Sequence, residues 1–333
     1  MLGRIPRLAP VCCASLLLAA PLAGCGAAGP SPSGAQTATT TASATRSAPR
    51  TRVALRPTAR ATLPAPVQLP ALAVVGGRLL AVGGLDAGDA SVADVVAVAP
   101  GKPQRVSQLP VAIHDAGATG LGGRLFVFGG GSASGPTAAI ETVARDGARA
   151  AGALPQPSSD LSAARAGTAA YVIGGFTGSA PLRSILRFVP GRPLRQVATL
   201  PHPLRYAAVA TVGSVVLIAG GTDGVHARRE IVRFDPATDS VRTIGSLPTP
   251  LEHAAGAALD GTFYVFGGRG ESLAGQRRTI YAIDPASGQV RGGGRLPFAL
   301  SDLSAATLGG RIWVVGGRDA AGDVHDEAWA LSR

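Results

Sequence analysis

The sequence has no cysteine after position 25 and no lysine other than Lys102. Its three cysteines are Cys12, Cys13 and Cys25, so the rest of the chain lacks the thiols that a disulfide, a cysteine nucleophile or a cysteine–metal site requires. Packing alone must therefore stabilise the folded part. The chain continues to residue 333, which is long enough to bury a sizeable core.

Acidic residues are also missing from residues 1–60, which contain seven arginines. These arginines account for most of the formal net charge of +11. A nucleic-acid-binding domain carries a basic stripe on its folded surface, whereas here the excess charge is concentrated at the N-terminus. We therefore expect no nucleic-acid partner.

The N-terminal segment has the features of an export signal. Arg4 and Arg7 precede the apolar stretch LAPVCCASLLLAAPLAG, which is too short and too interrupted by proline and glycine for a membrane span. The stretch ends in LAGC at positions 22–25, which resembles a bacterial lipobox. We expect residues 1–24 to be a lipoprotein signal peptide and Cys25 to carry the lipid, on the extracytoplasmic face of the cell membrane. An ordinary secretory signal or an uncleaved anchor are the alternatives.

Residues 25–55 are rich in alanine, serine, threonine, proline and arginine and show no apolar periodicity. Such a segment cannot bury a core, so we expect it to be a disordered tether. Its arginines lie close to the expected lipid anchor. They are either attracted to anionic headgroups or simply solvated.

Two markers repeat with the same phase from residue 63 to the C-terminus. Each of six Leu-Pro pairs lies twenty residues ahead of a Gly-Gly pair, and successive copies are 45 to 49 residues apart. The Leu-Pro pairs begin at Leu63, Leu109, Leu154, Leu200, Leu247 and Leu296, and the Gly-Gly pairs at Gly83, Gly129, Gly174, Gly220, Gly267 and Gly316.

Each period contains the signals of four short strands. The second is an apolar run that ends in Gly-Gly, such as GGRLFVFGG, and the first is rich in small residues, such as YAAVATV. Six periods of four antiparallel strands predict an all-β, six-bladed β-propeller over residues 56–333. The last period lacks a fourth strand, so we expect residues 58–62 to complete that blade and close the ring.

The repeats resemble the kelch family. The resemblance rests on the six apolar-strand–Gly-Gly units, the Leu-Pro pairs and an aromatic residue in the third strand of four repeats, while the fourth-strand Trp usual in the family is absent. It implies a scaffold with many uses, so function depends on the site. The four aromatic positions are Phe188, Phe234, Tyr281 and Trp329.

The hexapeptide SDLSAA occurs at residues 159–164 and 301–306, five residues after the Leu-Pro pair in both copies. It is therefore one structural position in repeats three and six, where the first strand reaches the mouth of the central channel. The same position in five of the six repeats is polar. The candidate ligand residues are His114, Asp115, Asp160, Arg205, Tyr206, Glu252, His253 and Asp302.

These residues allow either a structural role or a ligand site. Two histidines and three aspartates include possible metal ligands, but no close-spaced ligand motif accompanies them, and we expect neither a metal nor another cofactor. We favour a monomeric binding or scaffold module for a protein or an envelope glycan. The alternative is an extracytoplasmic sugar-active enzyme, because the kelch resemblance includes sialic-acid mutarotases. A lectin is a third option, although Tyr206 is the only aromatic residue at the mouth.

Overall fold

The computed structural model describes residues 54–144 and 146–333. The expected signal peptide, the lipidation site Cys25 and nearly all of the tether lie outside the described residues. The described part is all-β, as predicted. No helix in it has the length and apolar character needed to span a membrane.

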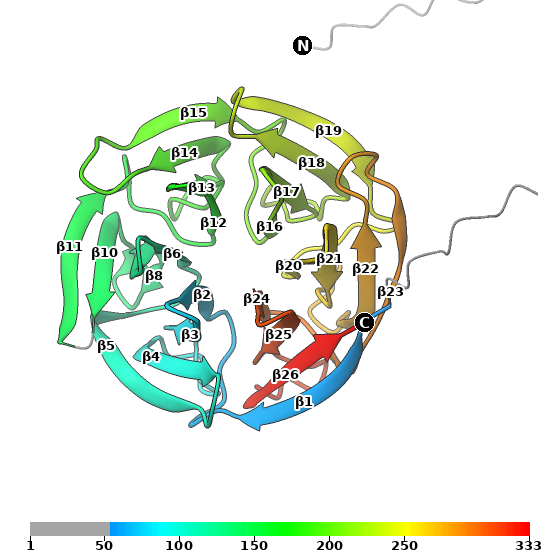
Figure 1. Cartoon of the computed structure of the whole chain (residues 1–333), viewed down its shortest axis with the longest axis horizontal. Helices are drawn as coiled ribbons and strands as arrows, with labels where there is room; N and C mark the ends of the chain where they lie inside the picture. Colours follow the sequence, from blue (N-terminus) through cyan, green and yellow to red (C-terminus); the bar gives the residue numbers. More distant parts are fainter. Residues whose placement is uncertain (1–53, 145) are drawn as a thin grey trace, which may run out of the picture. The chain divides into compact units, whose positions relative to one another are not determined.

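Six four-stranded antiparallel sheets form the blades of a ring (Figure 1). Blade one contains β2 (Ala71–Val75), β3 (Arg78–Val82), β4 (Val92–Ala99) and β5 (Gln104–Ile113). Blade two contains β6 (Gly117–Leu121), β7 (Arg124–Phe128), β10 (Ala139–Ala144) and β11 (Gly147–Ala153), with the small hairpin β8 (Gly131–Ser132) and β9 (Gly135–Pro136) inserted. Blade three contains β12 (Ser162–Ala166), β13 (Ala169–Ile173), β14 (Ser184–Phe188) and β15 (Arg195–Thr199).

The second half of the ring repeats this plan. Blade four contains β16 (Ala208–Val212), β17 (Val215–Ala219), β18 (Glu230–Asp235) and β19 (Ser240–Ser246). Blade five contains β20 (Ala255–Leu259), β21 (Thr262–Phe266), β22 (Arg277–Ile283) and β23 (Val290–Leu300). Blade six contains β24 (Ser304–Leu308), β25 (Arg311–Val315), β26 (Glu327–Ser332) and, as its outermost strand, β1 (Arg56–Thr62).

The pairing of β1 with β26 confirms that an N-terminal strand closes the ring. The two strands are antiparallel, with Arg56 opposite Ser332 and Thr62 opposite Glu327. The Thr58 hydroxyl also donates to the carbonyl of Ala330 at 3.2 Å. The closing strand begins two residues earlier than the sequence markers predicted. It covers the outer edge of β26, which would otherwise present unpaired backbone groups.

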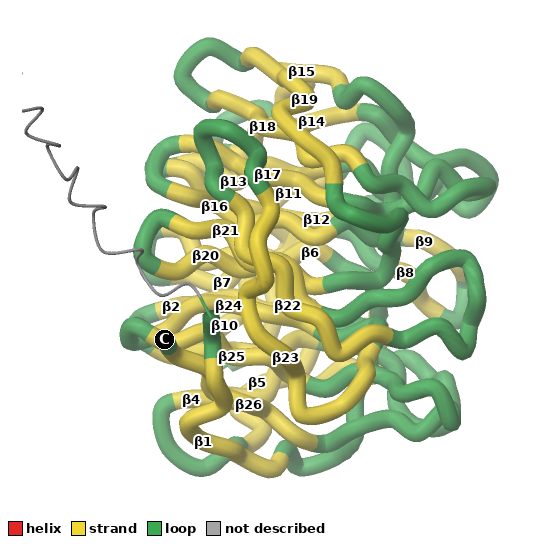
Figure 2. Tube along the Cα trace, turned by 90° about the vertical axis from the view of Figure 1, so that its right-hand side faces the viewer, coloured by secondary structure: helices red, strands yellow, loops and turns green. Residues whose placement is uncertain are grey.

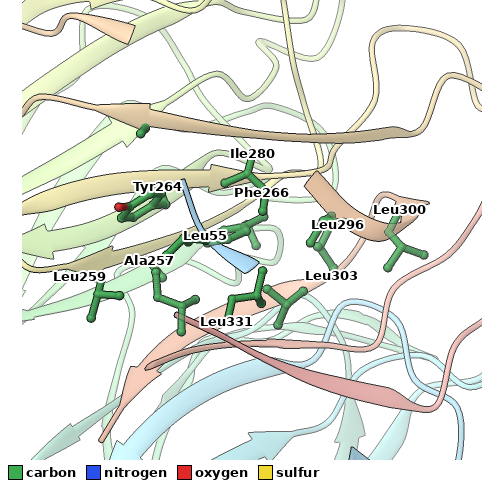
Figure 3. Packing of buried hydrophobic residues seen from close by; sticks show 14 residues of the cluster. Leu55, Ala257, Leu259, Tyr264, Phe266, Ile280, Leu296, Leu300, Leu303 and Leu331 are labelled. Carbon is green, nitrogen blue, oxygen red and sulfur yellow. The ribbon is translucent and has the colours of Figure 1, made fainter. Parts of the chain in front are cut away.

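The hydrophobic core consists of six clusters, each lying between two neighbouring blades. The second strand of a blade has a blade interface on both sides, so successive residues enter different clusters. In β21, Tyr264 and Phe266 pack toward blade six, whereas Phe263 and Val265 pack toward blade four. Figure 3 shows the first pair beside Leu331 of blade six. Burial on both faces explains why this strand is a continuous apolar run in every repeat.

Each Gly-Gly pair marks a close approach between blades. The first glycine has a positive φ and would place a Cβ against the backbone of the next blade. At Gly316 (φ 60°) that Cβ would lie 2.1 Å from the carbonyl oxygen of Val67, and at Gly174 (φ 60°) it would lie 2.1 Å from that of Leu204. The adjacent N–H groups of Gly317 and Gly175 donate to the same carbonyls at 2.9 Å. The repeat marker is thus the joint between blades.

The two faces of the ring carry different connections. On one face the first two strands of each blade are joined by tight turns, such as Val75-Gly76-Gly77-Arg78. The other face carries the longer loops that follow Gly-Gly, and Figure 2 shows these loops on its right-hand side, with β8 and β9 among them. We call this second face the mouth face.

Candidate functional site

Six equivalent pairs of residues lie at the mouth face, one at the start of each blade. The first residue of each pair forms a backbone bridge with the residue that follows Gly-Gly in the same blade, as between Glu252 and Arg269. The second residue adopts a left-handed conformation in all six blades, with φ between 53° and 59°. These second residues are Leu69, Asp115, Asp160, Tyr206, His253 and Asp302.

Backbone hydrogen bonds link the second residues from blade to blade around the channel. Five such N–H···O=C bonds occur among the described residues: Leu69 to Asp302 (2.6 Å), Asp115 to Leu69 (3.3 Å), Tyr206 to Asp160 (3.3 Å), His253 to Tyr206 (3.2 Å) and Asp302 to His253 (3.1 Å). The left-handed turn aims these groups sideways at the neighbouring blade. Backbone hydrogen bonds therefore hold these residues in place independently of their side chains.

The two copies of SDLSAA occupy equivalent places in this arrangement. Ser159 and Ser301 form the same bridge, with Phe176 and Arg318, and Asp160 and Asp302 share the left-handed turn. The repeated hexapeptide is thus part of the repeating fold.

A central cavity of about 150 Å³ lies on the channel axis, inside this ring. All six second residues line it, together with small residues of the innermost strands, and none of the first residues does so. The structure therefore gathers five of the eight sequence-predicted site residues around one cavity. These five are Asp115, Asp160, Tyr206, His253 and Asp302.

Arg205 connects three of the cavity residues although it does not line the cavity. Its Nη2 atom lies 2.8 Å from Oδ2 of the buried Asp160 and donates to the Tyr206 hydroxyl at 3.0 Å. The Tyr206 hydroxyl in turn hydrogen-bonds to the carboxylate of Asp115. The guanidinium also lies over the ring of Phe176, 4.3 Å from its centroid. One cation thus ties together blades two, three and four.

His253 continues the network into blades five and six. Its ring stacks on Tyr206, with centroids 3.7 Å apart, and its Nδ1 atom hydrogen-bonds to Oδ1 of Asp302. Burial alone would raise the pKa of Asp302, but the hydrogen bond and charge of His253, helped by the Ser301 hydroxyl, hold it below its ordinary value. The contact with a carboxylate favours a proton on Nδ1 of His253.

Asp115 has the opposite electrostatics. Burial raises its pKa well above the ordinary value, and the negative charges of Asp160 and Asp302 raise it further. Arg205 and the hydrogen bond from Tyr206 offset only part of this effect. Burial, together with Asp115 and Asp160, also raises the pKa of the Tyr206 phenol. The cavity therefore holds a carboxyl group poised to retain a proton beside an ionised one.

The other two sequence-predicted residues lie toward the loops. Glu252 accepts from Arg269, with Oε1 2.7 Å from Nη1, and lies 3.9 Å from His253 Nε2. His114 Nδ1 hydrogen-bonds to the hydroxyl of Ser91 at 2.8 Å, and burial lowers its pKa despite the charge of Asp160. Within the described ranges, His and carboxylate side chains form no group of three suited to a metal ion.

Sequence reasoning missed the loop residues that complete the mouth face. A second cavity of about 430 Å³ lies off the axis and is lined by Gln68, Asp89, Arg269, Gln276 and Arg318 among others. It adjoins the central cavity, since Leu69 and Asp302 line both. The signal was present, because Arg269 and Arg318 directly follow Gly-Gly in repeats five and six.

No protein-family model matches the chain, and no curated protein sequence matches it. Among solved structures, 655 chains match the fold. One of them, titled "Structure of YjhT", has a TM-score of 0.70 and 13% sequence identity, covering 82% of this chain and 96% of that chain. The chain is a six-bladed β-propeller. Because so many structures share the fold, the fold alone does not select a function.

Proposed function

We propose that this protein is a membrane-anchored, extracytoplasmic β-propeller that binds a polar ligand at the channel mouth. The ligand is a small molecule or a polar group presented by a protein or an envelope glycan. One observation carries the proposal: the cavity-lining residue of five blades is ionisable, and the five side chains share one cavity. The proposed location rests on the N-terminal signal features, and the kelch-type repeats are consistent with a binding scaffold.

The arrangement of charges supports binding more than catalysis. Asp160, Asp302 and Glu252 each have a cationic or histidine partner within the protein, so the mouth is electrostatically organised in the absence of a ligand. Such preorganised polar groups in a cavity give orientation and specificity to a bound polar molecule. The adjoining off-axis cavity supplies Arg318, whose partner Asp89 is itself well exposed and therefore easily replaced.

Thermal unfolding of the full chain against monosaccharides, sialic acid, peptidoglycan fragments and short peptides tests this function. A ligand at a hundred times its Kd should stabilise the native state by about 2.7 kcal/mol. The shift should disappear in Asp160→Asn. The matched control is Asp239→Asn, because Asp239 also has a positive φ (55°) but lies in an exposed turn.

A ligand whose shift survives Asp160→Asn but is lost in the control variant binds elsewhere, and that result would contradict the proposal. A shift lost in both variants would point to a general loss of stability. Urea unfolding of each variant without ligand separates that case.

One observation favours the enzyme alternative. Asp302 hydrogen-bonds to Nδ1 of His253 and both residues line the cavity, and a histidine oriented by a carboxylate is a common general base. Anomer interconversion of reducing sugars, including sialic acid, followed by NMR would reveal such chemistry. Acceleration by the wild-type chain that is lost in His253→Gln, with ligand binding retained, would establish it. Equal rates with and without the protein across the sugars would rule it out.

A further inference from the structure

The outermost strands of the six blades carry arginine and no acidic residue. Eight arginines lie on these strands, and all eight are exposed. They are Arg56 and Arg60 on β1, Arg105 on β5, Arg149 on β11, Arg195 on β15, Arg242 on β19, and Arg291 and Arg295 on β23. The rim is thus positively charged, and half of that charge belongs to β1 and β23.

The strands β1 and β23 meet where the chain enters the ring. Leu55 forms a parallel bridge with Gly294, and its N–H donates to the carbonyl of Gly293 at 2.8 Å. Arg56 and Arg295 directly follow the two bridged residues, so the bridge brings the start of β1 to the middle of β23. Figure 1 shows β1 following β23 along the outer rim. We call Arg56, Arg60, Arg291 and Arg295 the rim patch.

The rim patch has little internal neutralisation. Among the described residues only Arg60 of the four has a carboxylate within 4 Å, and that contact, with Glu327, is long at 3.9 Å. Elsewhere on the rim, Arg105 lies 2.8 Å from Asp94, and Arg149 pairs with Asp146, whereas Arg195 and Arg242 have no carboxylate within 4 Å among the described residues. Exposed cations without close counterions form a site of positive potential that attracts anions, and β1 and β23 together carry four of them.

We propose that the rim patch binds the anionic phospholipid headgroups of the membrane. This inference rests on the proposed anchoring at Cys25. The tether joins the ring at Leu55, beside the patch, so an anchored chain would hold these four arginines close to the bilayer at high effective concentration. The propeller then rests on its rim, with the channel axis along the membrane plane and the mouth open to the side.

Arginine-specific modification with phenylglyoxal, measured by mass spectrometry at each residue, tests the contact. The full chain is incubated with phosphatidylcholine vesicles or with vesicles of equal parts phosphatidylcholine and phosphatidylglycerol. Attraction of about 1 kcal/mol per charge corresponds to roughly fivefold slower modification of each patch arginine on the anionic vesicles. The internal controls are Arg105, Arg149, Arg195 and Arg242, which lie on the outermost strands of blades one to four and should change little.

Two variants sharpen the test. Changing the four patch arginines to serine should lower salt-sensitive co-flotation with anionic vesicles by tenfold or more, given about fivefold per charge, whereas the matched change of the four control arginines should not. Replacing the patch arginines by lysine should retain the binding and shows that charge, rather than the fold of β1, is responsible.

Several results would overturn the inference. Equal protection of patch and control arginines would indicate non-specific attraction, and equal protection on both kinds of vesicle would remove the role of charge. Protection by soluble polyphosphate but not by anionic vesicles would indicate a polymer ligand instead of a bilayer. Flotation with pure phosphatidylcholine vesicles reports the anchor alone, so failure of the anchoring proposal is distinguishable from failure of the patch.

Discussion

Asp115 of blade two and Asp302 of blade six are both aspartates at the same repeat position, yet their pKa values are shifted in opposite directions. Both have a left-handed backbone, with φ of 53° and 59°, and both line the central cavity. The pKa of Asp302 is lowered, whereas that of Asp115 is raised. The difference comes from their neighbours, because Asp302 contacts His253 and Ser301 while Asp115 faces other carboxylates.

The comparison shows that the repeat determines where each cavity side chain lies but does not determine its charge. The blade backbone brings six side chains to one cavity with the same geometry, and single substitutions then set the charge at each place. A ring of equivalent carboxylates would repel itself. Here one carboxyl group is stabilised as an anion and another is biased toward its neutral form, which lets both occupy a small cavity.

Removing Asp302, whose ionised form is stabilised, should have the largest effect on the free energy of unfolding. Asp302→Ala leaves the largely buried His253 without its carboxylate, and we expect the free energy of unfolding to fall by about 2–3 kcal/mol at pH 7. Urea unfolding measures the change. Asp239→Ala, at an exposed left-handed position, controls for backbone strain. An equal loss in the two variants would mean that the His253 contact contributes nothing.

Replacing Asp115, whose ionised form is destabilised, should change the free energy of unfolding by less and in the opposite direction. Asp115→Asn removes a negative charge that burial and the neighbouring aspartates disfavour. We expect the free energy of unfolding to rise by about 1 kcal/mol at pH 7. The same urea titration would contradict the raised pKa of Asp115 if Asp115→Asn were less stable than the wild type at that pH.

The two aspartates should also respond differently to pH. A raised pKa makes ionisation of Asp115 costly, so this destabilisation is absent below the ordinary pKa, grows as pH rises above it, and becomes constant above the raised pKa. A lowered pKa makes Asp302 stabilising above its ordinary pKa, and this contribution is lost only as pH falls through the lowered one. The gain from Asp115→Asn should therefore shrink between pH 7 and pH 5, whereas the loss from Asp302→Ala should not. Unfolding of both variants at the two pH values checks this.

An effect as small as that of Asp115→Asn is expected at Tyr206, which lies between Arg205 and Asp115. Tyr206→Phe keeps the stacking on His253 but removes the hydroxyl that Arg205 and Asp115 share. We expect a loss of about 1 kcal/mol. In a double-mutant cycle the loss should be smaller in the Asp115→Asn background, because the charge that the hydroxyl stabilises is gone. Strict additivity would show that Tyr206 does not act on Asp115.

Most of the fold was predictable, because the phase of Gly-Gly and Leu-Pro reports where blades meet and where they begin. The close approach of Gly316 to Val67 is a backbone requirement that only glycine satisfies, so it appears directly in the sequence. Closure by the N-terminal strand was predictable for the same reason, since one repeat lacked a strand.

The candidate site was only partly predictable. Repeat phase identified the pairs at the mouth but not which member lines the cavity, because that depends on the left-handed turn at the second residue. The repeat phase also did not predict which side chains contact each other. The contacts of Arg205 with Asp160 and of His253 with Asp302 join different blades, and they depend on the length and direction of the side chains. The Arg269 contact with Glu252 lies within one blade, between two positions that form a backbone bridge in every blade, so the repeat phase could have predicted it.

The closing strand has a consequence for the order in which the molecule can form. Thr58 and Ala330, which hydrogen-bond in the finished ring, are 272 positions apart in the chain. Among the described strands β1 is synthesised first and must wait for β26, so a chain that still lacks β26 is an open arc with β1 unpaired. Contacts of such high sequence separation form slowly and leave the unfinished chain exposed to aggregation. Synthesis of β26 is thus the event that allows the ring to close.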